Sequence, residues 1–386
     1  MLTKSVKFTN FKIKKNSLLI KKKLISLLKS KNEILNSLSQ NYKDNFTKKI
    51  LLKYKRNTDY RVIGMGGSSL GTQTIYDFLK HKIKKKFVFS DNLQVNLIKD
   101  KKKYTNLIVS KSGNTIETIV NANIFIKKKD RNIFITESKN SYLLNLAKKL
   151  KSDIIHHNNY IGGRYSVLSE VGMLPAELMG LKASNFRQLN NLIKNKQFIN
   201  SLISNVSSTL YFIKKKKFNS IIINYDERSE NLFNWYQQLI AESLGKKKKG
   251  LLPIVSNMPK DNHSTMQLYL DGFKNNFFTF FYVNEENSKK INNNSILTSQ
   301  NYLKNKDLSD ITLAQKKATE NVFKKKKIPF RSFEIKKRDE KTLGELFCFF
   351  ILETILIGQS MNLNPYDQPA VELIKIETKK LLIKNT

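Results

Sequence analysis

The sequence is poor in cysteine, proline and histidine, and it has few acidic residues for its content of basic ones. Cys348 is the single cysteine, so no disulfide can form within the chain and a disulfide-stabilised fold is excluded. This thiol lies among large apolar residues at 346–350, where a buried and inert cysteine is expected. A chain of this kind suits a reducing compartment, and we expect it to be cytoplasmic.

Long apolar runs are also absent. The segment 18–28 is interrupted by three lysines. The run 346–357 contains Glu353 and is shorter than the roughly 20 residues that a membrane-spanning helix needs. No signal peptide is recognisable. The sequence therefore predicts a soluble protein with no membrane partner.

The shortage of acidic residues gives a large positive charge, +39 from 70 Lys+Arg against 31 Asp+Glu. The lysines form short runs along the whole chain, as at 84–86, 214–217 and 324–327. A nucleic-acid interface would concentrate its charge on one element and interleave arginines or aromatic residues. The distribution therefore indicates a solvated basic surface and no specific nucleic-acid partner. Such a field would also attract a phosphorylated substrate.

Short apolar segments alternate with helix-length segments in two series. This alternation predicts an α/β fold with parallel sheets, because parallel strands need a crossover between them. The candidate strands are 61–64, 86–90, 106–109 and 132–136 in the first series, and 220–224, 277–281 and 332–335 in the second.

A division into domains follows from these two series, since the length allows two or three domains. The first fifty residues look helical and basic. We expect an N-terminal helical extension over 1–50, a first α/β domain over 51–188, and a second domain with a C-terminal helix over 189–386.

The segment Ser-Lys-Ser-Gly-Asn-Thr-Ile-Glu-Thr at 110–118 follows one of the predicted strands. Ligand sites in open α/β sheets lie beyond the carboxyl ends of the strands. Asn114 and Glu117 fit a capping box at a helix start. That explanation leaves a surplus of small hydrogen-bond donors, which suit a phosphate monoester. The candidate phosphate ligands are Ser110, Lys111, Ser112, Thr115 and Thr118.

A glycine-rich turn at 64–71 follows the first predicted strand. It can present backbone N–H groups and a helix N-terminus to an anion. The dinucleotide pattern G-x-G-x-x-G fits Gly64 and Gly66, but Ser69 stands at the third glycine position. Asp91, after the next strand, could mimic the ribose-binding acid. On this segment alone, a tight turn, a dinucleotide site and another anion site all remain open.

Two further segments carry candidate catalytic groups. Arg164 follows a glycine pair and could face a developing oxyanion, although on this motif alone a surface-loop arginine is the better explanation. Gln238 and Glu242 are four residues apart on a predicted helix and share one face. Glu242 is a candidate general base.

Near the end of the chain, two more residues stand in polar turns. His263, in Asp-Asn-His-Ser at 261–264, is one of four histidines, and an isolated histidine is more often structural than catalytic. Lys375 lies about two turns into a helix that begins near Pro369, and locally it is one lysine among many.

Together these segments resemble the glucose-6-phosphate isomerase (phosphoglucose isomerase) family. The resemblance covers nearly the whole chain after residue 55. It implies two sugar-isomerase (SIS) domains, each a parallel β-sheet flanked by helices, with helical N-terminal and C-terminal extensions. The matching segments, in the family's order, are GGSSLG at 66–71, SKSGNTIET at 110–118, GGRYSVLSEVG at 162–172, QQLIAESLGK at 237–246, DNHS at 261–264 and NPYDQPAVELIK at 364–375.

The resemblance implies interconversion of glucose 6-phosphate and fructose 6-phosphate through ring opening and an enediolate, in glycolysis and gluconeogenesis, with no cofactor and no metal. Glu242 would move the proton, Arg164 would stabilise the enediolate, and His263 and Lys375 would open the ring. A homodimer with His263 supplied across the interface is also implied. The substrate-binding residues would be Gly67, Ser68, Ser110, Lys111, Ser112, Thr115, Thr118, Gln238 and Gln368.

The sequence departs from the family pattern at two positions: Ala370 replaces a usual glycine, and Glu170 stands where small residues are common. The alternative function is a non-catalytic SIS-domain regulator that binds a sugar phosphate. It would keep both anion-binding loops but would not need Glu242, His263 and Lys375 together, and their joint presence favours the enzyme. A nucleic-acid binder, the other alternative, would retain DNA at physiological salt.

Overall fold

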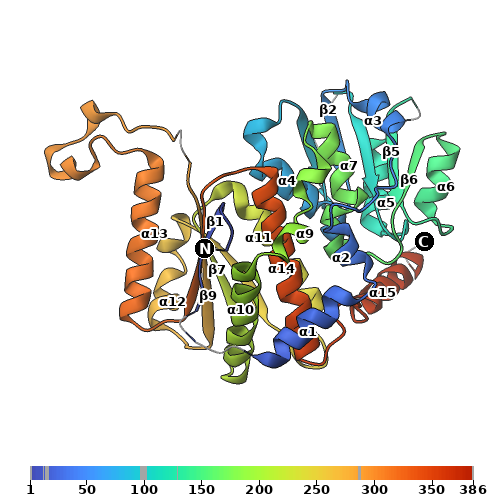
Figure 1. Ribbon diagram of the computed structural model, residues 1–386. Coiled ribbons are helices and arrows are strands. Elements are labelled where there is room, and N and C mark those ends of the chain that lie inside the picture. The colour runs from blue at the N-terminus through green and yellow to red at the C-terminus, as the bar shows by residue number, and fades with distance from the viewer. Residues whose placement is uncertain are drawn as a thin grey trace.

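The computed structural model describes residues 2–11, 13, 17–95, 102–127, 129–285 and 288–384. Within this part of the chain, two five-stranded sheets lie side by side, each flanked by helices (Figure 1). The predicted α/β fold with two parallel sheets is thereby confirmed. The first sheet is wholly parallel, in the order β3 (Lys86–Ser90), β2 (Asp59–Ile63), β4 (Thr105–Val109), β5 (Arg131–Thr136) and β6 (Asp153–His156).

The central strands of the first sheet are buried on both faces, as their unbroken apolar sequences require. Successive side chains of β4 point to opposite faces, so Leu107 and Ile108 belong to different cores. One core contains residues of α5 (Ile116–Phe125) and α6 (Tyr142–Lys149). The other includes α4 (Leu70–Phe78) and α7 (Glu170–Met179).

The second sheet repeats the strand order of the first. Its four parallel strands lie in the order β8 (Leu252–Asn257), β7 (Asn219–Asn224), β9 (Asn276–Val283) and β10 (Phe330–Ile335). One face packs against α12 (Met266–Asp271) and α13 (Leu308–Lys325). The opposite face packs against α10 (Lys196–Lys214), α11 (Glu230–Leu244) and α14 (Glu340–Ser360).

The first fifty residues are not only helical, and the prediction is wrong at their start. Val6–Thr9 forms strand β1, which pairs antiparallel with β10. Val6 and Phe8 point inward and the residues between them point outward, which is the period of a half-buried edge strand. Helices α1 (Leu18–Lys29), α2 (Glu33–Ser37) and α3 (Lys48–Tyr54) follow as predicted. The domain boundary near residue 189 stays a prediction.

Helix α14 is the central element of the second domain. By length and composition it is the one helix in the described residues that could cross a membrane, but 94% of its apolar window is buried inside the protein. Cys348 lies on this helix and is fully buried, as expected. Burial raises the pKa of its thiol to about 12, so the thiolate is scarce at neutral pH. The apolar run at 346–357 is therefore explained as core.

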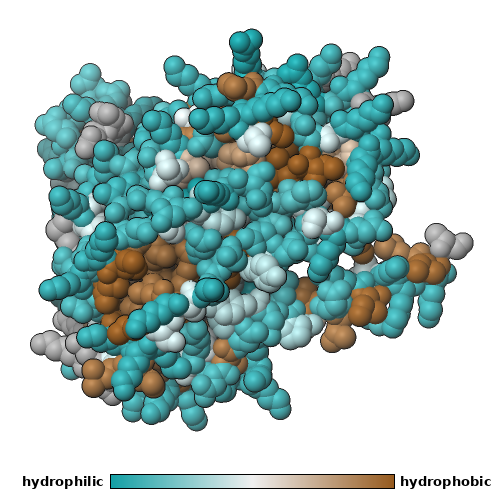
Figure 2. All heavy atoms as spheres, turned by 45° about the vertical axis from the view of Figure 1, so that its right-hand side comes forward, coloured by the Kyte–Doolittle hydropathy of each residue, from teal (hydrophilic) through white to brown (hydrophobic). Residues whose placement is uncertain are grey.

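The face of the molecule shown in Figure 2 is mainly hydrophilic, with separate hydrophobic patches. The C-terminal helix α15 (Val371–Lys384) has no buried residue. Its exposed apolar side chains are Val371, Leu373, Ile374, Ile376, Leu381, Leu382 and Ile383.

The contact between α14 and α8 (Ala183–Phe186) generates a prediction about stability. A Cβ atom at Gly344 would stand 1.9 Å from the carbonyl oxygen of Phe186. Gly344→Ala should therefore force the two helices apart and lower the free energy of unfolding by about 1–3 kcal/mol, as overpacked cores do. Chemical denaturation measures the change. Lys341→Ala, on the exposed side of the same helix, should stay within about 0.5 kcal/mol, and equal values for the two variants would contradict the close packing.

Candidate active site

A polar pocket lies at the carboxyl ends of β2 and β4. The chain leaves β2 toward β3 on one side and later returns to β4 on the other, so this is the point where the strand order reverses. Connections diverge at such a point and leave a crevice that ligands occupy. The pocket has a volume of about 260 Å³. Its lining residues are Met65, Gly67, Ser68, Ser110, Lys111, Ser112, Thr115, Glu137, Gly163, Arg164, Gln238, Glu242, Gln368 and Lys375.

The loop after β4 does not cap its helix in the way the sequence predicted. Thr115, not Asn114, is the N-cap of α5, and its side chain makes no capping hydrogen bond. Asn114 is taken by another partner, because its Oδ1 accepts from the backbone N–H of Tyr142. The Thr115 hydroxyl lies 3.0 Å from that of Ser110. The capping box is therefore absent, and the positive end of α5 faces the pocket without a side-chain cap.

Two further donors belong to this loop. The ammonium group of Lys111 donates to the carbonyl oxygen of Asn159 at 2.7 Å and lies 3.3 Å from a carboxylate oxygen of Glu137. Thr118 sits one turn inside α5 and is 1% exposed. Its hydroxyl has no hydrogen-bond partner among the described residues, and the side chain does not line the pocket.

The glycine-rich turn after β2 brings two backbones into contact. A Cβ atom at Gly67 would stand 2.3 Å from the carbonyl oxygen of Gly163 and 2.6 Å from the amide nitrogen of Arg164. Gly66 has a φ of +52°, and its open side faces the amide group of Gln238. The turn thus packs closely against the arginine loop, residues 162–164, and against α11. Asp91, the residue that would suit a dinucleotide, instead accepts a hydrogen bond from Gln73.

Arg164 is 3% exposed, and each of its five N–H groups can be assigned an acceptor. The guanidinium joins the short helix η3 (Gly163–Leu168) of the first domain to α11 and to the turn before α15. It therefore fixes groups of the pocket relative to one another. The acceptors are Ser243 Oγ at 2.8 Å, Glu242 Oε2 at 3.2 Å, Gln368 Oε1 at 2.8 Å, Pro365 O at 2.7 Å and Asp367 O at 2.9 Å.

Glu242 comes into the pocket from α11 of the second domain. One carboxylate oxygen accepts from Gln238 Nε2 at 2.8 Å, and the other accepts from Arg164. Its side chain is 26% exposed, so one side of the carboxylate stays open to the pocket. The Oε1 atom of Gln238 is buried without a hydrogen-bond partner among the described residues. An oriented carboxylate thus stands beside an unsatisfied acceptor, and an unsatisfied buried acceptor suits a ligand hydroxyl.

The remaining predicted catalytic residues are separated. Lys375, on α15, lines the pocket and lies 3.1 Å from Glu372. His263 does not line it. This histidine follows the carboxyl end of β8, whereas Glu242 stands near the amino end because α11 runs back along the sheet. The six residues of β8 span on the order of 15–20 Å at about 3.3 Å per residue, so His263 is far from the pocket of its own chain.

The structure also adds Met65, Glu137 and Gly163 to the pocket, none of which the sequence singled out. Glu137 directly follows β5, whose carboxyl end lies beside the loop after β4. Glu137 could have been predicted from its position at the end of a predicted strand. All predicted site residues except Thr118 and His263 line the pocket. The roles of all of them stay predictions.

Comparison with known proteins decides the family. The family model of phosphoglucose isomerase matches residues 53–385. This chain belongs to the phosphoglucose isomerase family. A glucose-6-phosphate isomerase of Methanocaldococcus jannaschii is 34% identical over 357 residues, which cover 85% of each chain. One of Mycoplasmopsis pulmonis is 30% identical over 84% of this chain and 82% of its own. The family predicted from the sequence motifs is confirmed.

Solved structures support the same fold. A hypothetical protein of Thermus thermophilus superimposes with a TM-score of 0.83 at 22% identity, covering 94% of both chains. A glucose-6-phosphate isomerase of Chlamydia trachomatis gives a TM-score of 0.72 at 17% identity, covering 90% of this chain and 77% of its own. At these identities the likeness concerns the fold, and it confirms the predicted two-domain SIS architecture.

The backbone contact at Gly67 generates a prediction for this member of the family. Gly67→Ala should push the arginine loop away and misplace Arg164, and a misplacement of about 1 Å can cost 10²-fold in rate. We expect kcat/KM for a hexose phosphate to fall at least tenfold. In Gly162→Ala the new Cβ would meet nothing closer than 3.8 Å, so that variant should keep most of its activity. Similar losses in both would contradict the role of the contact.

Proposed function

We propose that this chain is an aldose–ketose isomerase that interconverts glucose 6-phosphate and fructose 6-phosphate through ring opening and an enediolate. The observation that carries the proposal is the placement of one oriented carboxylate, Glu242, opposite an anion-binding loop in a single pocket. Membership of the phosphoglucose isomerase family supports it.

The loop at 110–115 is the phosphate end of the pocket. The uncapped N-terminus of α5 attracts an anion through its free N–H groups. The hydroxyls of Ser110, Ser112 and Thr115 and the ammonium of Lys111 add donors around it. Thr118, whose hydroxyl lacks a partner in the described structure, lies directly behind the loop. If these side chains capped the helix, their hydrogen-bonding groups would not be free to bind a phosphate.

The proton transfer is assigned to Glu242. Its carboxylate removes the proton from C2 of the open-chain aldose and returns it to C1. In the same conversion O1 gains a proton and the O2 hydroxyl loses one, so that the ketose results. Arg164 faces the oxygen on which negative charge develops, exchanging its bond to Glu242 or Gln368 for one to the enediolate. Base catalysis typically gives roughly 10²–10⁴-fold, and one oxyanion donor adds about 2.7–4 kcal/mol.

The non-catalytic regulator has no observation in its favour. Such a module needs the phosphate loop but gains nothing from a carboxylate that two donors hold at the open side of the pocket. We therefore retain the enzymatic function. From the family we assign it to glycolysis and gluconeogenesis. The lone buried thiol supports a place in the cytoplasm.

We also propose a homodimer in which His263 completes the site of the partner subunit. Two observations support it. His263 lies beyond the far end of β8 from Glu242, so it is poorly placed for its own pocket. The exposed apolar side chains of α15 form a surface that a second subunit would cover, since large exposed apolar patches mark association sites. In this proposal, His263 and Lys375 together open the sugar ring.

Glu242→Gln tests the base directly. The amide keeps the shape but cannot take up a proton, and its single oxygen can accept from only one of the two donors, Gln238 and Arg164. Isomerisation of fructose 6-phosphate should therefore fall by on the order of 10²-fold or more. Binding of a substrate analogue should change little. Glu230→Gln, the same substitution at the exposed start of α11, is the control and should keep wild-type activity. Retention of more than about a tenth of the activity by Glu242→Gln would contradict the assignment.

Mixing two inactive variants tests the dimer. Subunits with Glu242→Gln are exchanged with subunits that carry His263→Ala. In a mixed dimer one site holds an intact glutamate and an intact partner histidine, while the other carries both lesions. About half of the dimers are mixed by simple counting, so activity should recover to roughly a quarter of wild type. Subunits that exchange without recovering activity would place His263 outside the partner's site.

A further inference from the structure

A buried ion pair lies behind the pocket, in a segment that the proposed mechanism does not use. His157 begins the segment 157–161 that leads from β6 to η3. Its Nδ1 is 2.9 Å from Glu170 Oε1, and its Nε2 is 3.0 Å from the carbonyl oxygen of Ile161. The side chains of His157 and Glu170 are 1% and 0% exposed. Both neighbours of the ring only accept hydrogen bonds, so both ring nitrogens must donate and the imidazole carries a positive charge.

Glu170 is held by more than the histidine. It stands at the start of α7, where the helix dipole favours a negative charge. It also accepts from the backbone N–H of Asn158 at 2.7 Å and from the hydroxyl of Tyr42 at 3.0 Å. Burial acts to raise the pKa of Glu170, but the hydrogen bond and charge of His157 outweigh it and keep this pKa below its usual value. The carboxylate therefore remains ionised opposite the imidazolium.

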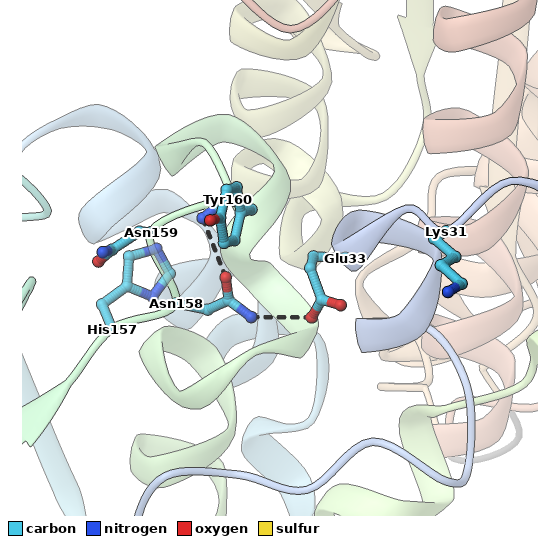
Figure 3. Close-up of a pocket in the computed structure, with 6 residues that line it drawn as sticks. All are labelled: Lys31, Glu33, His157, Asn158, Asn159 and Tyr160. Atoms are coloured by element: carbon cyan, nitrogen blue, oxygen red, sulfur yellow. Dashed lines mark hydrogen bonds between the residues drawn. The ribbon is translucent and has the colours of Figure 1, made fainter.

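The segment held by this pair reaches the phosphate loop. Figure 3 shows its outer side, where Asn158 donates to Glu33 at 2.9 Å and accepts from the backbone N–H of Tyr160 at 2.9 Å. On the inner side, the carbonyl oxygen of Asn159 accepts from the ammonium of Lys111 at 2.7 Å. The carbonyl that directs Lys111 thus lies two residues from His157 and is fixed by the ion pair.

We propose that His157 and Glu170 form a positioning pair that directs Lys111 toward the phosphate group of the substrate through segment 157–161. Neither side chain touches the substrate; the pair acts by fixing the carbonyl of Asn159. The inference rests on the proposed function, because it takes the loop at 110–115 to bind the sugar phosphate. Its effect falls on the affinity for phosphate and spares the proton transfer at Glu242.

Other ionisable groups face the pair, and they provide a control. Tyr42 and Asp44 approach from the N-terminal segment, Glu177 from α7, and Glu33 and Lys31 from the outer side. Asp44 is itself buried, but its partner is Arg187 at 2.6 Å. No hydrogen bond joins Asp44 to segment 157–161 in the described structure, so neutralising it removes a nearby buried charge without releasing the segment.

The test compares Glu170→Gln with wild type on fructose 6-phosphate and, separately, on inorganic phosphate as a competitive inhibitor that reports the phosphate subsite alone. The amide has no negative charge opposite the ring and offers one acceptor oxygen in place of two, so it cannot keep all three hydrogen bonds that Glu170 accepts. KM and the inhibition constant of phosphate should rise together about three- to tenfold, the factor expected for one net hydrogen bond, with kcat within about twofold. Asp44→Asn should leave both constants unchanged.

A second variant covers the case in which Glu170→Gln fails to fold. The double variant His157→Gln, Glu170→Gln removes both charges and leaves no unpaired charge buried. It should show the same rise in KM and in the phosphate inhibition constant. Wild-type constants in either folded variant would overturn the proposal. If the wild type did not isomerise hexose phosphates at all, the proposed function would fail instead, and phosphate binding measured by calorimetry would still test the pair.

Discussion

The site depends on the hydrogen bonds that the guanidinium group of Arg164 donates. A buried arginine must satisfy five N–H groups at fixed angles, because unsatisfied buried donors are costly. The acceptors come from α11 of the second domain and from the segment 365–368, while the arginine itself belongs to the first domain. The site can form only when these segments meet. Arg164 thus ties the two domains together at the pocket and fixes the direction of Glu242.

The two sheets have the same strand order, yet they serve the site differently. In the second sheet the order reverses between β7 and β9. The carboxyl ends there are filled by Asp226 and Glu285, which pair with Arg338. Two carboxylates that already share the guanidinium of Arg338 offer no site for a phosphate. In the proposed function, the first domain therefore binds the anion, and the second supplies the base from the far end of a crossover helix.

Sequence patterns predicted the features that depend on local chemistry. Continuous apolar runs such as those of β4 and β9 indicate buried parallel strands, and all seven predicted strands are present. Motif order led to the family and to most of the residues that line the pocket. Each of these signals lies within a dozen neighbouring residues, so no knowledge of distant contacts was needed.

The features that the sequence did not reveal depend on distant partners. Strand β1 has four residues, and its register is set by β10, with Val6 opposite Ile335. The predicted capping box at Asn114 is absent because the Asn114 side chain accepts a hydrogen bond from the backbone N–H of Tyr142 instead. No sequence motif surrounds His157, and its pairing follows only from the acceptors that the fold places at both ring nitrogens.

Arg164→Lys tests the central claim most directly. Lysine keeps the positive charge but has three donors and no plane, so it cannot hold Glu242, Gln368 and the turn at 365–367 together. The measurement is kcat/KM for fructose 6-phosphate, on protein whose folding is verified by its thermal transition. A loss of about 10²-fold or more is expected, as for removal of one oxyanion donor. A folded variant within about threefold of wild type would show that the charge alone suffices and that Arg164 does not organise the site.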